Sequence, residues 1–169
     1  MSISNKQNII QSALDLFVTN GYHFTSTNQI IAVAKTSKGA LFYHFKDKEE
    51  IAVAVLRYYY HQTLKKPLEE ILKKSKDPQQ GLLEFIDLIY DEFAKYDFVG
   101  GCLLGNFALE ISDTSKRLTQ LTRELFLDWE GIITDYLSEL SEPQKLAKFI
   151  IWGIQGVTLT GKLFKNFAT

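Results

Sequence analysis

The stretch that constrains the fold most begins at Thr25 and reads TSTNQIIAVAKTSKGALFYHFKDKEE. It holds two short runs with apolar residues at helical spacing, joined by a few polar residues. The residues expected to face inward are Ile30, Ile31 and Ala34 in the first run and Leu41 and Phe45 in the second. Two short helices around a tight turn form a helix-turn-helix, whose second helix lies in the major groove of DNA.

The residues left on the outer side of the second helix are of kinds that bind DNA. Lys38 can read guanine O6 and N7, and Gly39 lets the helix approach the base pairs closely. A lysine at the start of the following helix, Lys48, adds charge where the helix dipole favours an anion. The expected DNA-binding residues are Ser26, Ser37, Lys38, Gly39, Ala40, Phe42, Tyr43, His44 and Lys48. The alternative is that the aromatic residues among them belong to the core.

This region resembles the N-terminal DNA-binding domain of TetR/AcrR-type transcriptional repressors over about the first 55 residues. The resemblance rests on SerLysGly at 37–39, LeuPheTyrHisPhe at 41–45 and AspLysGluGlu at 47–50. Three departures are Lys35 where the family often has Gly, Ile31 where it has a small residue, and Phe42 where it has Tyr. Since the family's Tyr binds a phosphate, the resemblance implies that Tyr43, His44 and the lysines carry more of that contact.

The rest of the chain is also predicted to be helical, because no segment shows sustained alternation of apolar and polar residues. We therefore expect an all-α fold with a three-helix DNA-binding domain at 1–46 and a helical effector-binding and dimerisation domain at 47–169. The expected helices cover about 5–20, 26–35, 37–45, 47–66, a stretch from Pro78, 102–111, 113–140 and 143–166. Asp47 with Glu50 forms an Asp variant of the capping box, Asp113 caps the long helix, and Pro67 kinks a helix or starts a new one.

Charge is distributed unevenly although the net charge is −1. Residues 1–48 hold five lysines and two aspartates, a net charge of +3, while the remainder carries −4. A basic head on an acidic body suits a protein whose head alone touches phosphate, although chance can give +3 in a short window. The single Cys excludes an internal disulfide and suits a reducing cytoplasm. With no signal-peptide pattern and no apolar run of about 20 residues, we expect a cytoplasmic chain without a membrane span.

Glycines in the last predicted helix suggest a close helix–helix contact. Gly153, Gly156 and Gly161 lie among large apolar residues, and helical glycines are tolerated where backbones approach each other. This contact lies either within the chain or between two copies. The resemblance favours a homodimer, because a helix-turn-helix repressor reads a two-fold operator as a dimer.

The body is rich in aromatic residues, and the resemblance implies that it binds an inducer. The candidate effector-binding residues are Tyr59, Phe85, Ile89, Phe93, Cys102, Phe107 and Trp129, although core packing accounts for residues of this kind as well. Cys102 follows two glycines near a helix start, where a thiol can become reactive. The alternative is that Cys102 is a small buried apolar residue.

The sequence thus predicts a ligand-responsive repressor that binds a palindromic DNA operator as a homodimer and is released by a small hydrophobic effector. Two alternatives are a thiol- or electrophile-sensing repressor acting through Cys102 and a helical adaptor that does not bind DNA. An enzyme is not expected, because His23, His44 and His61 lack metal-ligand spacing and no nucleophile motif is present. No metal and no cofactor are expected either.

Overall fold

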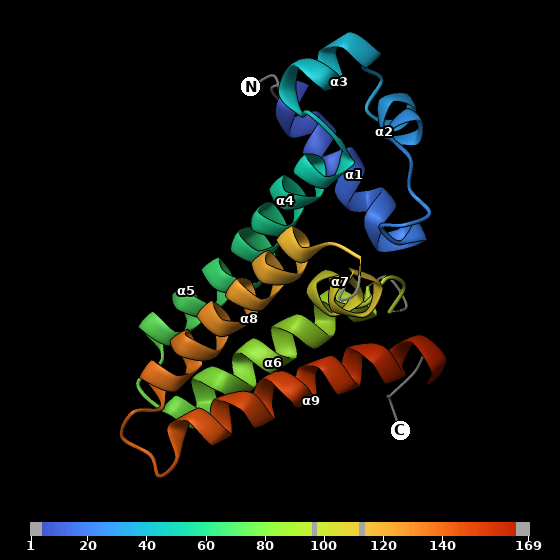
Figure 1. The fold of residues 1–169 in the computed structure, drawn as a ribbon. Helices are drawn as coiled ribbons and strands as arrows, with labels where there is room; N and C mark the ends of the chain where they lie inside the picture. Colours follow the sequence, from blue (N-terminus) through green and yellow to red (C-terminus); the bar gives the residue numbers. More distant parts are fainter. Residues whose placement is uncertain (1–4, 96–97, 112–113, 165–169) are drawn as a thin grey trace.

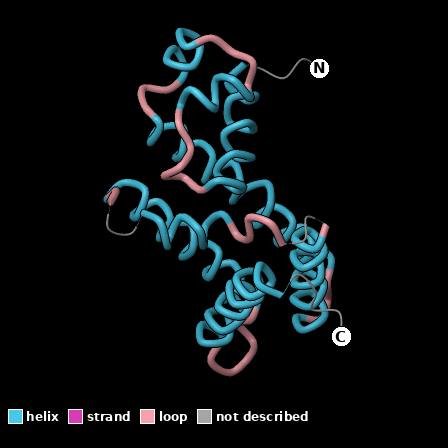
Figure 2. The backbone as a smooth tube through the Cα atoms, turned by 90° about the vertical axis from the view of Figure 1, so that its right-hand side faces the viewer, coloured by secondary structure: helices cyan, strands magenta, loops and turns pink. Residues whose placement is uncertain are grey.

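The computed structural model describes residues 5–95, 98–111 and 114–164, without the side chain of Lys162. Every regular element in these ranges is helical, which confirms the predicted all-α fold (Figures 1 and 2). The helices are α1 (Asn5–Asn20), α2 (Thr27–Val33), α3 (Lys38–His44), α4 (Lys48–Tyr59), the π-helical turn η1 (Tyr60–Lys65), α5 (Lys66–Lys74), α6 (Pro78–Ala94), α7 (Leu103–Ile111), α8 (Lys116–Tyr136) and α9 (Pro143–Phe164). No described helix is both long and apolar enough to cross a membrane.

Helices α1, α2 and α3 pack around a small core at one end of the molecule (Figure 1). Ile30, Ala34, Leu41 and Phe45 are buried as expected, and Ile31 is partly buried. Ser26 and Ser37 cap α2 and α3, since their hydroxyl groups accept hydrogen bonds from the backbone N–H of Gln29 and Ala40. The Gln29 side chain in turn accepts a hydrogen bond from the backbone N–H of Ser26. The stretch that begins at Thr25 therefore forms the predicted pair of helices.

The turn between α2 and α3 contains Lys35, one of the departures from the family pattern. Helix α2 ends at Val33, two residues before the predicted end, and Lys35 has φ of +48°. This left-handed conformation is one that glycine adopts freely and a residue with a Cβ adopts at a cost. The family's usual glycine would therefore adopt this conformation at a lower cost than Lys35 does.

Helix α4, η1 and α5 form one long rod, and α8 runs beside it (Figure 1). Asp47 caps α4 through the N–H of Glu50, but Glu50 bonds the N–H of Lys46 and not that of Asp47. The rod changes to a π-helical turn just before Pro67, where the N–H of Lys66 donates to the carbonyl of His61. Since Pro67 has no N–H to donate, a new helix can start there, as predicted.

The body is closed by α6, α7, α8 and α9, and its core contains Phe85, Leu103 and Trp129, all fully buried. The expected bounds of the long helix were wrong. Helix α8 begins at Lys116, where Ser115 accepts from the N–H of Leu118, and it ends at Tyr136 and not near Leu140. The expected cap, Asp113, lies outside the described residues.

The close helix–helix contact expected at Gly153 and Gly156 is not found among the described residues. A methyl group added to either glycine would have no atom of these residues within 4 Å. Gly161 faces the ring of Phe98, which precedes α7, and not α8. Gly153 instead borders the groove between α6 and α9, and Gly156 is exposed.

Candidate functional site: the DNA-binding helices and the groove in the body

The outer face of α3 carries the predicted DNA-binding groups. The side chain of Tyr43 is 85% exposed and that of Phe42 is 42% exposed, so neither is a core residue. Lys38 and Gly39 are exposed as well, while Ala40 and His44 are partly buried. The core interpretation holds only for Phe45, and the remaining surface is open to a groove of DNA.

Ser26 and Ser37 are exposed, and their hydroxyl groups cap helices. The Ser26 Oγ accepts from the Gln29 N–H at 3.2 Å and donates to its Oε1 at 2.9 Å. The Ser37 Oγ accepts from the Ala40 N–H at 3.1 Å. A contact of either serine with DNA remains a prediction.

Lys48 lies differently from the expectation. Its Nζ points back into the domain and donates to the carbonyl oxygens of Tyr22 and Thr25, both at 3.0 Å, and lies 4.3 Å from the centre of the Tyr22 ring. Burial lowers the pKa of Lys48, and the charge of Glu110 opposes that effect. The ammonium group thus fastens the turn between α1 and α2 to the start of α4.

The same turn contacts α7 of the body. Phe107 packs its ring against Phe17 at 5.7 Å and Tyr22 at 5.3 Å between ring centres. The Glu110 carboxylate accepts from the backbone N–H of His23 at 3.0 Å, and His23 Nε2 lies 2.9 Å from the Glu110 carbonyl oxygen. Sequence reasoning missed this contact, because no local spacing connects residues 87 positions apart.

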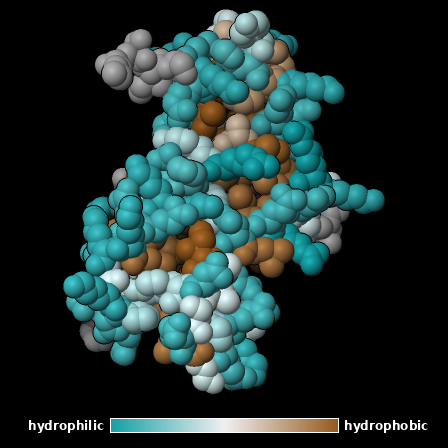
Figure 3. All heavy atoms as spheres, turned by 90° about the vertical axis from the view of Figure 1, so that its left-hand side faces the viewer, coloured by the Kyte–Doolittle hydropathy of each residue, from teal (hydrophilic) through white to brown (hydrophobic). Residues whose placement is uncertain are grey.

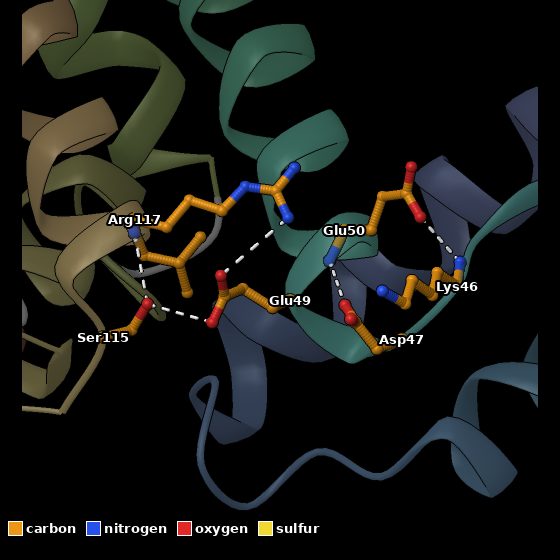
Figure 4. A network of polar contacts seen from close by, with 7 residues as sticks. Lys46, Asp47, Glu49, Glu50, Ser115 and Arg117 are labelled. Atoms are coloured by element: carbon orange, nitrogen blue, oxygen red, sulfur yellow. Dashed lines mark hydrogen bonds and ion pairs between the residues drawn. The ribbon is translucent and has the colours of Figure 1, made fainter.

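A polar network joins the first turn of α4 to the start of α8 (Figure 4). Glu49 accepts a hydrogen bond from the Ser115 hydroxyl at 3.0 Å, and Arg117 lies 3.9 Å from its other carboxylate oxygen. Ser115 is also the cap of α8. Glu49, at the start of α4, is therefore hydrogen-bonded to Ser115, which caps the long helix α8 of the body.

The structure does not bring the seven predicted effector residues together in one cavity. Ile89 and Phe93 line an apolar groove of about 350 Å³ between α6 and α9, together with Tyr90 and Phe149. Phe85 and Trp129 pack on each other in the core, at 6.3 Å between ring centres. The remaining three, Tyr59, Cys102 and Phe107, are buried elsewhere. Periodicity shows which residues are buried but not which ones border a cavity.

Cys102 is 3% exposed, beside a smaller pocket of about 250 Å³ between α7, α8 and α9. It directly precedes α7 and its carbonyl accepts from the N–H of Asn106. Burial raises the pKa of the Tyr59 hydroxyl well above its usual value. Cys102 is thus buried, although it borders this pocket. Among the described residues, no group of His, Cys, Asp and Glu is arranged to hold a metal ion.

Two family profiles match the chain. The profile "Bacterial regulatory proteins, tetR family" matches residues 9–55, and "Transcriptional regulator LmrA/YxaF-like, C-terminal domain" matches residues 78–167. An uncharacterised HTH-type transcriptional regulator in the lacX 3′ region of Lactococcus lactis subsp. lactis is 30% identical, over 96% of this chain and 86% of the relative.

Two further proteins are similar over most of their length. The HTH-type transcriptional repressor DhaR of Mycobacterium sp. (strain GP1) is 27% identical, over 95% of this chain and 84% of the relative. A TetR transcriptional regulator from Legionella pneumophila has the same fold, with a TM-score of 0.88, 24% identity and coverage of 98% of this chain and 91% of that chain. Given the profile match over more than half of the sequence and the relative at 30% identity, the chain belongs to the TetR family of bacterial transcriptional regulators.

Proposed function

We propose that the protein is a ligand-responsive repressor that binds a palindromic operator as a homodimer and releases it when a small hydrophobic molecule binds to the body. The observation that carries the proposal is the presence of three surfaces on one chain. These are the exposed face of α3, an exposed apolar stripe on α9, and the apolar groove between α6 and α9, which adjoins that stripe at Phe149. Repression is further supported by the similarity to DhaR, which is named a transcriptional repressor.

The homodimer is supported by two opposite stripes on α9. Ala147, Ile151, Ile154 and Thr158 are buried against the rest of the chain. The other stripe consists of Phe149, Trp152, Gly156, Leu159 and Leu163, all exposed, and Trp152 is 68% exposed. An exposed patch made of several large apolar side chains typically marks an interaction site. Apolar groups also reach the surface in patches on the face drawn in Figure 3.

The effector is supported by the chemistry of the groove. Its lining is mainly apolar and aromatic, with Tyr90, Phe93 and Phe149 as the largest side chains, and it includes the carboxylate of Asp87. A groove of about 350 Å³ lies within the range of small-molecule sites. We therefore place a hydrophobic effector here and not in the closed core around Trp129.

Binding of the two ligands is coupled through the geometry of the dimer. Two recognition helices have to lie about 34–36 Å apart to enter successive major grooves on one side of the duplex. An effector that binds better to a body with another separation lowers operator affinity by linkage. Contacts of α4 and α7 with the turn between α1 and α2 connect the body to the DNA-binding helices, so a change in the body can alter that separation.

Two lysines should differ in how they contribute to DNA binding. We expect Lys38→Met to weaken binding to all duplexes and to reduce the slope of log K against log salt by about 1, because an exposed ammonium releases a counterion from phosphate. We expect Lys48→Met to weaken binding about tenfold with an unchanged slope, because its Nζ holds two carbonyls of the protein. Fluorescence anisotropy over a series of salt concentrations measures both. An equal fall in slope for Lys48→Met would show that its Nζ binds a phosphate in the complex.

The dimer surface can be tested with charged substitutions on two helices. Trp152→Glu should raise the dimer dissociation constant by about 30-fold or more, as loss of an aromatic anchor costs about 2 kcal/mol. Leu83→Glu, at an exposed apolar residue on α6, serves as the control and should leave the mass unchanged. A methyl group on Gly156 would meet no atom of the described residues within 4 Å, so we expect Gly156→Leu to act on the dimer contact and also to give monomer. Sedimentation gives the masses, and a wild-type monomer at micromolar concentration would rule out the dimer.

Cys102 distinguishes the two kinds of effector. Since the thiol is buried, its labelling by 4,4′-dithiodipyridine should be about 100-fold slower in the native protein than in urea. Cys102→Ser should bind operator DNA normally and should still be released by any hydrophobic compound that releases the wild type. Rapid labelling that releases DNA, together with an unresponsive Cys102→Ser protein, would establish the thiol-sensing alternative instead.

A further inference from the structure

The connection between α6 and α7 contains a residue in an unfavourable backbone conformation. Phe98 has φ of +57°, a region that bulky residues seldom occupy, and its side chain is only 3% exposed. Such a conformation persists when the surrounding structure holds it in place. The contacts that hold Phe98 therefore have to offset the cost of this conformation.

The ring of Phe98 is held between two helices of the body. It packs edge-on against Tyr90 of α6, with 5.4 Å between ring centres and 65° between ring planes. On α9 it occupies the space that a side chain at residue 161 would need, since a methyl group on Gly161 would lie 2.5 Å from its Cδ1. The backbone N–H of Phe98 donates to the carbonyl of Phe93 at 2.9 Å. The position of the ring therefore depends on how α6 and α9 lie relative to each other.

Two residues further on, the same connection touches the DNA-binding domain. Gly100 has φ of +86°, and a methyl group on it would lie 2.1 Å from Val18 Cγ1 and 3.0 Å from the Val18 carbonyl oxygen of α1. The carbonyl of Gly100 accepts a hydrogen bond from the side chain of Asn106 on α7. No side chain fits between Gly100 and α1, so a shift of this segment is passed directly to that helix.

We propose that Phe98 is a positioning residue that sets the orientation of α1, and with it α3, relative to the body. This role of Phe98 rests on the proposed function and describes how the effector acts. Tyr90 lines the effector groove on one side and contacts Phe98 on the other, so a ligand that moves Tyr90 moves the connection that rests on α1. Packed interfaces of this kind have a few discrete arrangements, which lets a small displacement at the groove change the separation of the recognition helices.

The experiment uses no effector and measures half-site spacing. Duplexes selected from a random pool by the wild-type protein are remade with the centre shortened or lengthened by one or two base pairs, and affinity is measured for each. Gly161→Ala pushes on the Phe98 ring, and we expect about tenfold weaker binding at the wild-type spacing together with a displaced or flattened optimum. Binding to a duplex with one half-site should stay within about twofold. Gly131→Ala on α8, where a methyl group meets no atom within 4 Å, is the control and should keep the wild-type profile.

A second variant separates positioning from simple damage. Phe98→Gly removes the ring and favours the observed backbone conformation, and it should broaden the spacing preference with little loss on one half-site. In that background Gly161→Ala should have no further effect, because the ring through which it acts is gone. Additive effects would overturn the positioning role. So would a Phe98→Gly protein with the sharp wild-type optimum, and that result does not depend on whether Gly161→Ala folds. A wild type without preference for two half-sites over one would instead contradict the dimeric operator of the proposed function.

Discussion

The structure depends on an aromatic contact between its two parts. Phe17 and Tyr22 at the end of α1 meet Phe107 of α7, and Lys48 of α4 lies over the Tyr22 ring and binds two carbonyls of the adjoining turn. Without this cluster, the three DNA-binding helices would be joined to the body mainly along α4. Since Phe17 and Phe107 are fully buried, the core continues from one part into the other.

Operator recognition by a dimer requires such a stiff connection. A recognition helix that rotated freely on α4 would lose the fixed separation by which two half-sites are read together. The polar contacts around the cluster restrict the same motion, because Glu110 holds His23 and Glu49 holds Ser115. In the proposed function, an effector therefore needs only to favour a second arrangement of the same contacts and does not need to reach the DNA-binding helices itself.

Local signals in the sequence predicted much of the fold. Ser26 and Ser37 are residues typical of helix starts and cap α2 and α3, and Gly21 is typical of a helix end and has a left-handed conformation after α1, with φ of +83°. Capping and helical periodicity depend on residues a few positions apart, which a sequence displays directly. The end of α8 was wrong by several residues because apolar spacing continued past Tyr136 into a turn. Contacts such as Phe107 with Tyr22 depend on the packing of distant segments, so they were not foreseen.

The central claim, that the contact around Phe107 fixes the separation of the recognition helices, can be measured as a distance in the dimer. Spin labels on Lys38→Cys in a Cys102→Ser background place one label on each α3 helix, and double electron–electron resonance gives the distribution of distances between them. We expect one narrow distribution without DNA or effector, and a clearly broader one after Phe107→Leu, which removes the ring contacts while the dimer mass stays the same. An equally narrow and unshifted distribution in the Phe107→Leu protein would contradict the account.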